Sequence, residues 1–280
     1  MQRLNVSIVL HNTPSGQLEG VLSSLSSVSL NKIFIIENSN SPNYRNITET
    51  NPKIIYRHIE NHGYGHAHNI AFRESIKDGA DFHLVLNPDV MWETGVLEQL
   101  MDFMVKNVRV GVVQPKICNP DGSLQYSCRL IPSPADLFAK RFIPSGFFNS
   151  RTDRFLLRSY SHEGIINVPY LTGCFLLFRV TALKECGLFD ERFFLYPEDL
   201  DLVRRMHETW HTVYYPVVSV IHEHQRDSAK KLRMLFIHFS NMVLYFNKWG
   251  WIKDKKRKKF NDALLNHLNL EKKRKTPGPK

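Results

Sequence analysis

The sequence predicts an α/β fold in which a mostly parallel central sheet is flanked by helices and followed by a helical, basic C-terminal extension. Three observations support this prediction: short apolar runs recur in the first half, helix-like segments separate them, and polar residues follow the runs directly. Short apolar strands that alternate with helices are typical of parallel sheets whose two faces are both covered. Ligands of such sheets bind at the carboxyl ends of the strands.

The first half of the chain carries the patterns that define this class. We interpret four apolar runs as buried strands, at residues 6–10, 33–36, 54–56 and 83–86. Apolar residues at helical spacing predict a helix over 14–28, and a second predicted helix over 67–77 follows a glycine-containing loop. Polar segments that follow the strands should line one edge of the sheet together, namely His11-Asn12, Glu37-Asn38 and Asn87-Pro88-Asp89.

The second half is less regular. Apolar runs predict two longer strands over 110–117 and 168–179, and Asp121-Gly122 indicates a turn. The segment 131–164 contains prolines and scattered Arg and Phe without a clear period, so we interpret it as a loop-rich insertion. Residues 232–246 carry apolar side chains at i, i+3, i+4 and i+7 spacing, which predicts an amphipathic helix.

Composition is that of a globular protein, and the charge lies at one end. The 280 residues are 42% hydrophobic and 23% charged, with a formal net charge of +10. From Lys248 to Lys280 there are twelve Lys or Arg and three Asp or Glu, so residues 1–247 are nearly neutral. Because the basic excess lies outside the predicted folded body and no nucleic-acid-binding module is recognisable, we expect no nucleic-acid partner.

The cysteines and the N-terminal residues predict a cytoplasmic protein. Cys118, Cys128, Cys174 and Cys186 show neither CxxC pairing nor metal-ligand spacing, which favours a reducing compartment. No signal-peptide pattern precedes the first predicted strand. No apolar run reaches about 18 uncharged residues, so a transmembrane span is not expected.

A run of carboxylates is the most informative local feature. Glu198, Asp199 and Asp201 fall within four positions, directly after an aromatic stretch that ends at Pro197. A helix that begins near Pro197 would hold Glu198 and Asp199 in its first turn, where the helix dipole favours anions. These side chains could serve as bases or bind a cation, or they could cap an ordinary helix.

Two further strand ends carry side chains that could bind a divalent cation. Asp89 directly follows a predicted strand, and a carboxylate there suits Mg²⁺ bridging two phosphates, although turn residues are also common at such a place. His222 ends another apolar run, where a solvent-exposed histidine is the alternative. The loop at 61–69 contains Gly63 and Gly65, but a GxG pattern without the Lys-Ser/Thr of a P-loop indicates phosphate binding only weakly.

Taken in order, these pieces resemble the inverting family 2 glycosyltransferases of the GT-A fold, in the branch of rhamnosyltransferases. The resemblance rests on an ordered series of motifs: Glu37-Asn38-Ser39, Asn61-x-Gly63-x-Gly65, Asn87-Pro88-Asp89-Val90, Tyr170-Leu171-Thr172-Gly173-Cys174, Gly187-Leu188-Phe189-Asp190-Glu191 and Glu198-Asp199-x-Asp201-Leu202. It spans residues 5–250, and the order and spacing of the motifs make it specific although no single motif is decisive. The fold that it implies has a Rossmann-like nucleotide-binding sheet.

The resemblance implies a role for each matching residue. Asp199 matches the catalytic base, and Glu198 and Asp201 would support the base or the acceptor. Asp89 matches the metal-binding Asp of the family's DxD motif, and His222 matches the C-terminal histidine of the metal site. Residues at strand ends and in loops would bind the donor: His11, Asn12, Glu37, Asn38, Asn69, Asn87 and Gly173.

The implied activity is transfer of a sugar from a nucleotide diphosphate donor to a hydroxyl of a glycan or lipid-linked glycan in bacterial cell-surface polysaccharide synthesis. The donor implied is dTDP-L-rhamnose, with Mg²⁺ or Mn²⁺ on the diphosphate. A UDP-hexose or another deoxysugar donor is the alternative within this class. A sugar nucleotidyltransferase and a basic nucleic-acid-binding protein are the alternatives from other classes.

The implied organisation is a catalytic domain over 1–228 followed by an amphipathic helix and basic tail over 229–280. The catalytic domain would have a nucleotide-sugar-binding half, 1–120, and an acceptor and catalytic half, 121–228. An apolar helix next to tryptophans and a basic run favours peripheral binding to an anionic membrane surface on its cytoplasmic face, and a helix packed on the catalytic domain is the alternative. The last residues, 272–280, are expected to be disordered.

Overall fold

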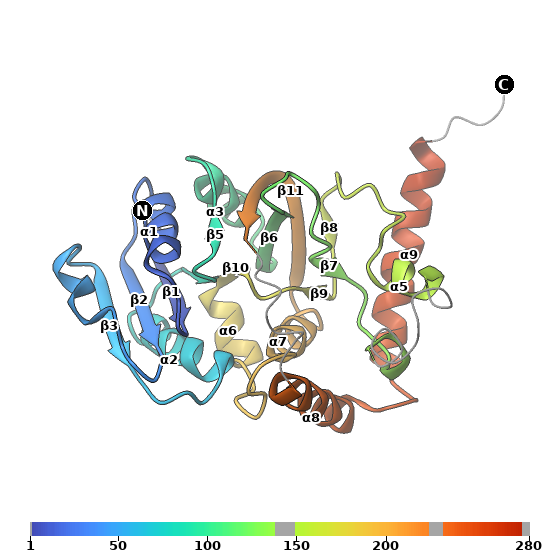
Figure 1. Cartoon of the computed structure of the whole chain (residues 1–280). Coiled ribbons are helices and arrows are strands. Elements are labelled where there is room, and N and C mark those ends of the chain that lie inside the picture. The colour runs from blue at the N-terminus through green and yellow to red at the C-terminus, as the bar shows by residue number, and fades with distance from the viewer. Residues whose placement is uncertain (1, 138–148, 224–231, 276–280) are drawn as a thin grey trace.

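The computed structural model describes residues 2–137, 149–223 and 232–275, and these form a nine-stranded sheet with helices on both faces (Figure 1). The strands of this sheet are β1 (Leu4–Leu10), β2 (Lys32–Glu37), β3 (Ile54–His58), β4 (Phe82–Leu86), β5 (Val90–Met91), β6 (Val110–Cys118), β8 (Ile166–Asn167), β10 (Phe175–Arg179) and β11 (His211–His222). Their order is β3-β2-β1-β4-β10-β6-β11-β5, with β8 paired to β11. A separate small sheet pairs β7 (Cys128–Arg129) with β9 (Tyr170–Leu171).

The pairing confirms the predicted α/β class with a mostly parallel sheet. Parallel pairs join β1 to β2 and to β4, β2 to β3, and β6 to β11. Strand β10 is inserted antiparallel between β4 and β6. Every residue of β1 and of β4 is buried, because helices cover both faces of the sheet there. The four strands expected in the first half are all present, each longer than predicted by one to two residues at an end.

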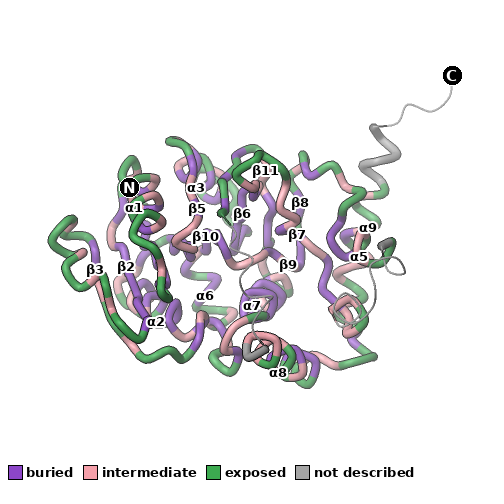
Figure 2. The backbone as a smooth tube through the Cα atoms, viewed as in Figure 1, coloured by how far each residue is buried: buried purple, intermediate pink, exposed green. Residues whose placement is uncertain are grey.

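Helices make a layer on each face of the sheet. One face is covered by α1 (Ser15–Leu25) and α3 (Val96–Lys106), and the other by α2 (Tyr64–Lys77), α6 (Val180–Cys186) and α7 (Glu198–Met206). The other helices of the described residues are η1 (Arg45–Glu49), α5 (Asn149–Phe155), α8 (Leu232–Trp249) and α9 (Lys255–Lys275). Figure 2 shows the sheet and α7 as the most buried parts of the chain. The helix α7 therefore lies largely in the core.

One predicted strand is wrong, because the structure divides it into two strands. The run 168–179 was expected as one long strand, but the structure divides it into β9 and β10. Between them, the amide N of Gly173 turns away from strand pairing and donates a hydrogen bond to Asp199 Oδ2 at 2.8 Å. Hydrophobicity continues through the break, so the sequence pattern alone does not reveal it. The break brings this segment to the first turn of α7.

The C-terminal segment folds as two helices, α8 and α9. The predicted amphipathic helix is confirmed as α8, while the basic run after it, which the sequence left without an assigned element, forms the start of α9. The carboxylate of Asp254 accepts a hydrogen bond from the amide of Arg257 at 2.9 Å and so caps α9. The helix continues to Lys275, past residue 272, where disorder was expected. The expected domain boundary at 228–229 and residues 276–280 lie outside the described residues.

Within the described part of the chain, no helix is long and apolar enough to span a membrane.

Candidate functional site

A cavity of about 420 Å³ lies where the end of β4, the end of β11 and the start of α7 meet. Its position is the ligand-binding edge expected from the strand polarity. Five of the residues predicted from the sequence line it together: Asn87, Gly173, Glu198, Asp199 and His222. These residues are separated by up to half of the chain, and the fold brings them to one hollow.

Asp199 lies in the first turn of α7 and is held by backbone amides. Its Oδ1 accepts a hydrogen bond from the amide of Leu200 at 2.7 Å, in addition to the bond from Gly173 to Oδ2. A Cβ atom at position 173 would lie 3.2 Å from the Asp199 Cβ, so a glycine allows this close approach. Asp199 is only 7% exposed, and it faces the cavity.

Glu198 and Asp199 form a coupled pair of buried carboxyl groups. Burial, and then the charge of Asp199, raises the pKa of Glu198 to about 8. Burial also raises the pKa of Asp199. The amides of Leu200 and Gly173 oppose this rise, because their hydrogen bonds stabilise the ionised carboxylate. Among the described residues, Glu198 Oε2 has no hydrogen-bond partner. A pKa of about 8 favours the protonated form of Glu198 at neutral pH, while the amide hydrogen bonds to Asp199 favour its ionised form.

The glycine-containing loop positions the walls of the cavity. Gly63 has a φ of +102°, and a Cβ atom there would lie 2.2 Å from the backbone oxygen of Phe194. The next amide, of Tyr64, donates to that same oxygen at 3.0 Å. The Tyr64 hydroxyl lies 2.9 Å from both Asn87 Oδ1 and Gly173 O. The loop thus joins the segment before α7 to the strand ends, and this contact explains why glycine is required.

Asp89 and His222 lie side by side, with 3.3 Å between Asp89 Oδ1 and His222 Nε2. The amide of Gln125 orients the imidazole. Its Nε2 donates to the carbonyl of His222 and to Asn119 Oδ1, each at 2.7 Å, so its Oε1 accepts from His222 Nδ1 at 2.9 Å. Gln125 therefore fixes one ring proton on Nδ1, and Nε2 is the ring atom that faces Asp89.

Asp89 and His222 suit a divalent cation whose coordination is completed by a bound substrate. Burial lowers the pKa of His222, but hydrogen bonds with Asp89 and Cys174 outweigh burial and raise it to about 10. In the described ranges, no group of three His, Cys, Asp or Glu side chains could hold a metal ion. One carboxylate and one imidazole suit a cation whose remaining ligands are phosphate oxygens and waters. The donor set therefore matches Mg²⁺ or Mn²⁺ bound together with a diphosphate.

Three predicted donor-binding residues lie together at the ends of β1 and β2. His11 Nδ1 lies 3.0 Å from Asn38 Oδ1. Asn12 has a φ of +52°, and its amide donates to Ser39 Oγ at 2.8 Å. Strand β1 is the neighbour of β4 and β2 is the next strand beyond it, so the polar edge expected from the sequence is present and extends beyond the 420 Å³ cavity.

Two other predicted donor-binding residues are buried and bonded within the protein. Glu37 is 0% exposed, and its carboxylate accepts from the hydroxyl of Tyr56 at 2.6 Å and the amide of Asn43 at 3.1 Å. Asn69 is 1% exposed and bonds the backbone of Phe189 in both directions, at 2.9 and 3.0 Å. These side chains shape the loops at the edge of the sheet.

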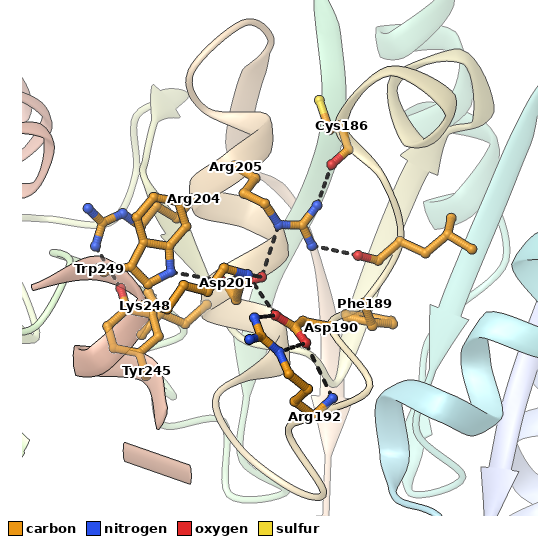
Figure 3. Close-up of polar contacts among 12 residues, drawn as sticks. Cys186, Phe189, Asp190, Arg192, Asp201, Arg204, Arg205, Tyr245, Lys248 and Trp249 are labelled. Atoms are coloured by element: carbon orange, nitrogen blue, oxygen red, sulfur yellow. Dashed lines mark hydrogen bonds and ion pairs between the residues drawn. The ribbon is translucent and has the colours of Figure 1, made fainter. Parts of the chain in front are cut away.

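Asp201, the third carboxylate of the run, faces away from the cavity and joins α7 to α8 (Figure 3). It is 0% exposed and accepts hydrogen bonds from Arg205 Nε at 2.9 Å, Lys248 Nζ at 2.9 Å and Trp249 Nε1 at 2.8 Å. The neighbouring Arg204 is 1% exposed and pairs with Asp254 at 2.7 Å. Asp201 therefore supports the helix that carries Asp199.

The cavity also contains residues that the sequence motifs did not indicate. Tyr64 was part of a motif, but its hydroxyl was given no role. Gln125 and Arg129 lie in a segment without a motif, and no sequence signal marks them. His238 and Met242 come from α8, so the amphipathic helix supplies part of the wall of the cavity. Of these two residues, only Met242 is one of the apolar positions that predicted the helix over 232–246.

Comparison with known sequences places most of the chain in one family. The family described as "Glycosyltransferase like family 2" matches residues 49–236. An N-acetylglucosaminyl-diphospho-decaprenol L-rhamnosyltransferase of Mycobacterium tuberculosis is 32% identical over 160 residues, in each of two strains. Those residues are 54% of this chain and 49% of that protein, so the chain spans about half the length of the curated relatives it matches.

Solved structures of low sequence identity share the fold. GalNAc-T7 with UDP, GalNAc and Mn²⁺ matches with a TM-score of 0.61 at 16% identity, over 79% of this chain and 43% of that one. The mannosyltransferase PcManGT of Pyrobaculum calidifontis, in complex with GDP-Man and Mn²⁺, matches with a TM-score of 0.55 at 14% identity, over 95% and 75%. S. aureus TarS matches with a TM-score of 0.58 at 12% identity, over 95% and 43%. These likenesses confirm the GT-A fold expected from the sequence.

Proposed function

The chain belongs to glycosyltransferase family 2, and from this membership we propose that it transfers a sugar from a nucleotide diphosphate donor to an acceptor hydroxyl with inversion. The observation that carries the proposal is the cavity that Asp199 and His222 line together, with Asp89 Oδ1 3.3 Å from His222 Nε2. One carboxylate and one cation site at a strand-end hollow are the groups that this reaction needs.

Asp199 is proposed as the general base. An acceptor hydroxyl that attacks the anomeric carbon must lose its proton, and the amides of Leu200 and Gly173 stabilise the ionised form of Asp199 that can accept it. The two backbone bonds to its oxygens fix the direction of the carboxylate while leaving lone pairs for the hydroxyl proton. Glu198, which holds the proton of the pair, would donate a hydrogen bond within the site and keep a second negative charge out of it.

Asp89 and His222 are proposed to hold the divalent cation, and Gln125 to orient His222. When bound, the cation would neutralise charge that develops on the leaving diphosphate. Gly173 and Asn87 would lie against the donor, because both line the cavity and bond the same tyrosine hydroxyl. His11, Asn12 and Asn38 would contact the nucleotide at the neighbouring strand ends, with Glu37 and Asn69 shaping the loops around it.

For substrates, we propose L-rhamnose from dTDP-L-rhamnose and a lipid-linked glycan acceptor. The support is the relative of Mycobacterium tuberculosis, whose name describes transfer of L-rhamnose to a diphospho-decaprenol-linked sugar. The alternative is a UDP-hexose or another deoxysugar donor, since neighbours of the same fold were crystallised with UDP and GDP-Man.

A panel of nucleotide sugars tests donor and reaction class together. Purified protein should hydrolyse one donor slowly without acceptor, and dTDP-L-rhamnose is expected to be the preferred one. Released nucleotide is measured for each donor with Mn²⁺ present. No hydrolysis of any nucleotide sugar, together with no transfer to a lipid-linked acceptor, would sink the proposal.

The first variant to examine is Asp199→Asn, which removes the base but preserves shape and hydrogen bonding. Transfer should fall by about 10²–10⁴-fold, the usual contribution of a general base. Donor affinity, measured by calorimetry, should stay within about twofold of the wild type, since the cation site is untouched. Near-normal turnover in the variant would exclude Asp199 as the base.

Metal removal addresses the cation site. Transfer should stop in excess chelator and return when Mg²⁺ or Mn²⁺ is added, and Gln125→Leu should raise the metal concentration needed for half-maximal activity by about 10–100-fold. Mn²⁺ affinity measured by electron paramagnetic resonance in the presence of nucleotide provides a readout apart from turnover. Full activity in chelator would contradict a cation at Asp89 and His222.

We also propose that the protein binds the cytoplasmic surface of an anionic membrane. Exposed apolar side chains gather on α8 and just after it, with Phe236 71% exposed and Ile252 86% exposed. Lys253 and Lys255 follow and are exposed to solvent. An apolar surface next to a basic run is the pattern of interfacial attachment.

A further inference from the structure

A second cavity, of about 780 Å³, lies between α5, the segment at 131–136 and the first turns of α9. None of the residues assigned above to donor, cation or base lines it. Six cationic side chains line it: Arg151, Arg154, Lys253, Lys255, Arg257 and Lys258. Three carboxylates, of Asp136, Asp254 and Asp262, line it as well.

The cavity carries more positive charge than its carboxylates neutralise. Asp136 pairs with Arg151 at 2.6 Å. Asp254 pairs at 2.7 Å with Arg204, which is not part of the cavity wall and comes from the core. Two of the three carboxylates are thus compensated. The remaining cationic side chains outnumber the remaining carboxylate, so the cavity suits an anionic ligand.

Arg257 gives a second indication of a ligand. Its Nη2 lies 3.3 Å from the carbonyl of Ile252, whereas its Nη1 is buried and has no hydrogen-bond partner among the described residues. Buried polar groups of folded proteins are nearly always bonded, so such an atom calls for an acceptor. Guanidinium groups bind phosphate oxygens with paired hydrogen bonds, so a phosphate is the acceptor that suits Arg257.

The surroundings of the cavity show which kind of phosphate it fits. The segment at 131–137 separates it from the proposed active site, because Ile131 and Ser133 line this cavity while Pro132 and Leu137 line the other. At its rim lies Ile252, 86% exposed. A ligand that is anionic at one end and apolar at the other would place its charge among the cations and its chain against the rim.

We propose that this cavity binds the diphosphate of a prenyl-diphosphate-linked acceptor. The prenyl chain would then lie along the exposed apolar surface, and the attached sugar would reach past the segment at 131–137 toward Asp199. The role as an acceptor site rests on the proposed glycosyl transfer. The binding of a prenyl diphosphate does not, and it can be measured separately.

Binding is tested by calorimetry with farnesyl diphosphate and the full-length chain, in chelator so that no cation draws a diphosphate to the donor site. Arg154 and Lys258 are exposed, so Arg154→Gln with Lys258→Gln should fold normally. We expect this double variant to raise the Kd at least tenfold. Lys259→Gln, a matched change on the same helix outside the cavity, should leave the Kd within twofold.

Three results would overturn the proposal. The first is a double variant that binds farnesyl diphosphate as the wild type does. The second is equal weakening by Lys259→Gln, which would mean diffuse attraction to the basic helix. The third is inorganic pyrophosphate binding as tightly as farnesyl diphosphate, which would make the cavity a site for a soluble anion only.

Kinetics separate this proposal from the proposed function. In the double variant the KM for a prenyl-diphosphate-linked acceptor should rise about tenfold or more, while donor hydrolysis without acceptor stays at the wild-type rate. An unchanged acceptor KM would contradict the acceptor role. A further outcome is a wild type that hydrolyses no donor and still binds farnesyl diphosphate more tightly than the double variant does. In that case the proposed function fails and the prenyl-diphosphate site remains.

Discussion

At the scale of single residues, the chemistry depends on how Glu198 and Asp199 share a proton. Adjacent carboxyl groups at the start of a helix would both be ionised if water surrounded them. Burial raises the pKa of each, and the amides of Leu200 and Gly173 stabilise the ionised form of Asp199. The same two residues can therefore supply one acid and one base at neutral pH.

This arrangement predicts a pH-dependent gain in stability for Glu198→Gln. The pKa of Glu198 is about 8 in the folded chain and near its ordinary value of 4.5 when unfolded, so between these values the unfolded state binds fewer protons. Stability of the wild type should therefore fall as pH rises through this window. The variant should exceed it at pH 8 by about 1.4 kcal/mol or more, the equivalent of at least one pKa unit.

Urea unfolding at pH 5 and at pH 8 measures this effect. The difference between variant and wild type should be small at pH 5 and large at pH 8. A difference that is the same at both values would show that Glu198 ionises normally in the folded chain. The variant should retain donor binding, because Glu198 has no contact with the proposed cation site.

At the scale of elements, α7 carries Asp199, the proposed base, in its first turn and makes structural contacts along its other side. Figure 3 shows Asp201 and Arg204 of α7 facing Lys248, Trp249 and Tyr245 of α8. The Arg204 guanidinium lies 3.9 Å from the centroid of the Trp249 ring. The C-terminal helices therefore pack on the catalytic helix, and α8 also forms part of the cavity wall.

The Arg204–Asp254 pair should be essential to this packing. Arg204→Met leaves the buried Asp254 carboxylate without its cation and should lower the free energy of unfolding by about 3–5 kcal/mol. Adding Asp254→Asn removes that charge and keeps a good helix cap, so the double variant should recover part of the loss. Thermal unfolding of the wild type, single and double variants checks this, and additive losses would contradict a direct pairing.

At the scale of the whole molecule, the candidate-site cavity shares helix α8 with the surface that we propose binds a membrane. The helix α8 lines the cavity with His238 and Met242, while Phe236 and Phe239 are 71% and 44% exposed. One helix thus lines the cavity and presents apolar side chains to the outside. Docking through this surface would bring the cavity to lipid-linked acceptors.

Phe236→Ser with Phe239→Ser tests this docking. The variant should float with vesicles that contain anionic lipid about tenfold less than the wild type, because it loses the apolar contact and retains only charge attraction. Val108→Ser, a matched change at a position that is 67% exposed outside α8, should float as the wild type does. Equal flotation of the three proteins would defeat the proposal, and circular dichroism confirms that each is folded.

Several features could be predicted from sequence alone. The α/β class followed from apolar runs that alternate with helical segments, and both the polar edge and the helix at Glu198 followed from residues at the ends of these elements. Local hydrophobic periodicity and capping determine such features, so neighbouring residues are enough to reveal them. The order and spacing of the motifs further indicated the family.

Only the tertiary structure decided which of these residues meet. It separated Asp201, a partner of α8, from Asp199, and it buried Glu37 and Asn69 in contacts within the protein. It placed Gln125 on His222 and broke the run 168–179 at Gly173 to reach Asp199. It also folded the basic run into α9, where its cations line a cavity with α5. These outcomes depend on packing and hydrogen bonds between segments far apart in the chain, which local sequence patterns do not encode.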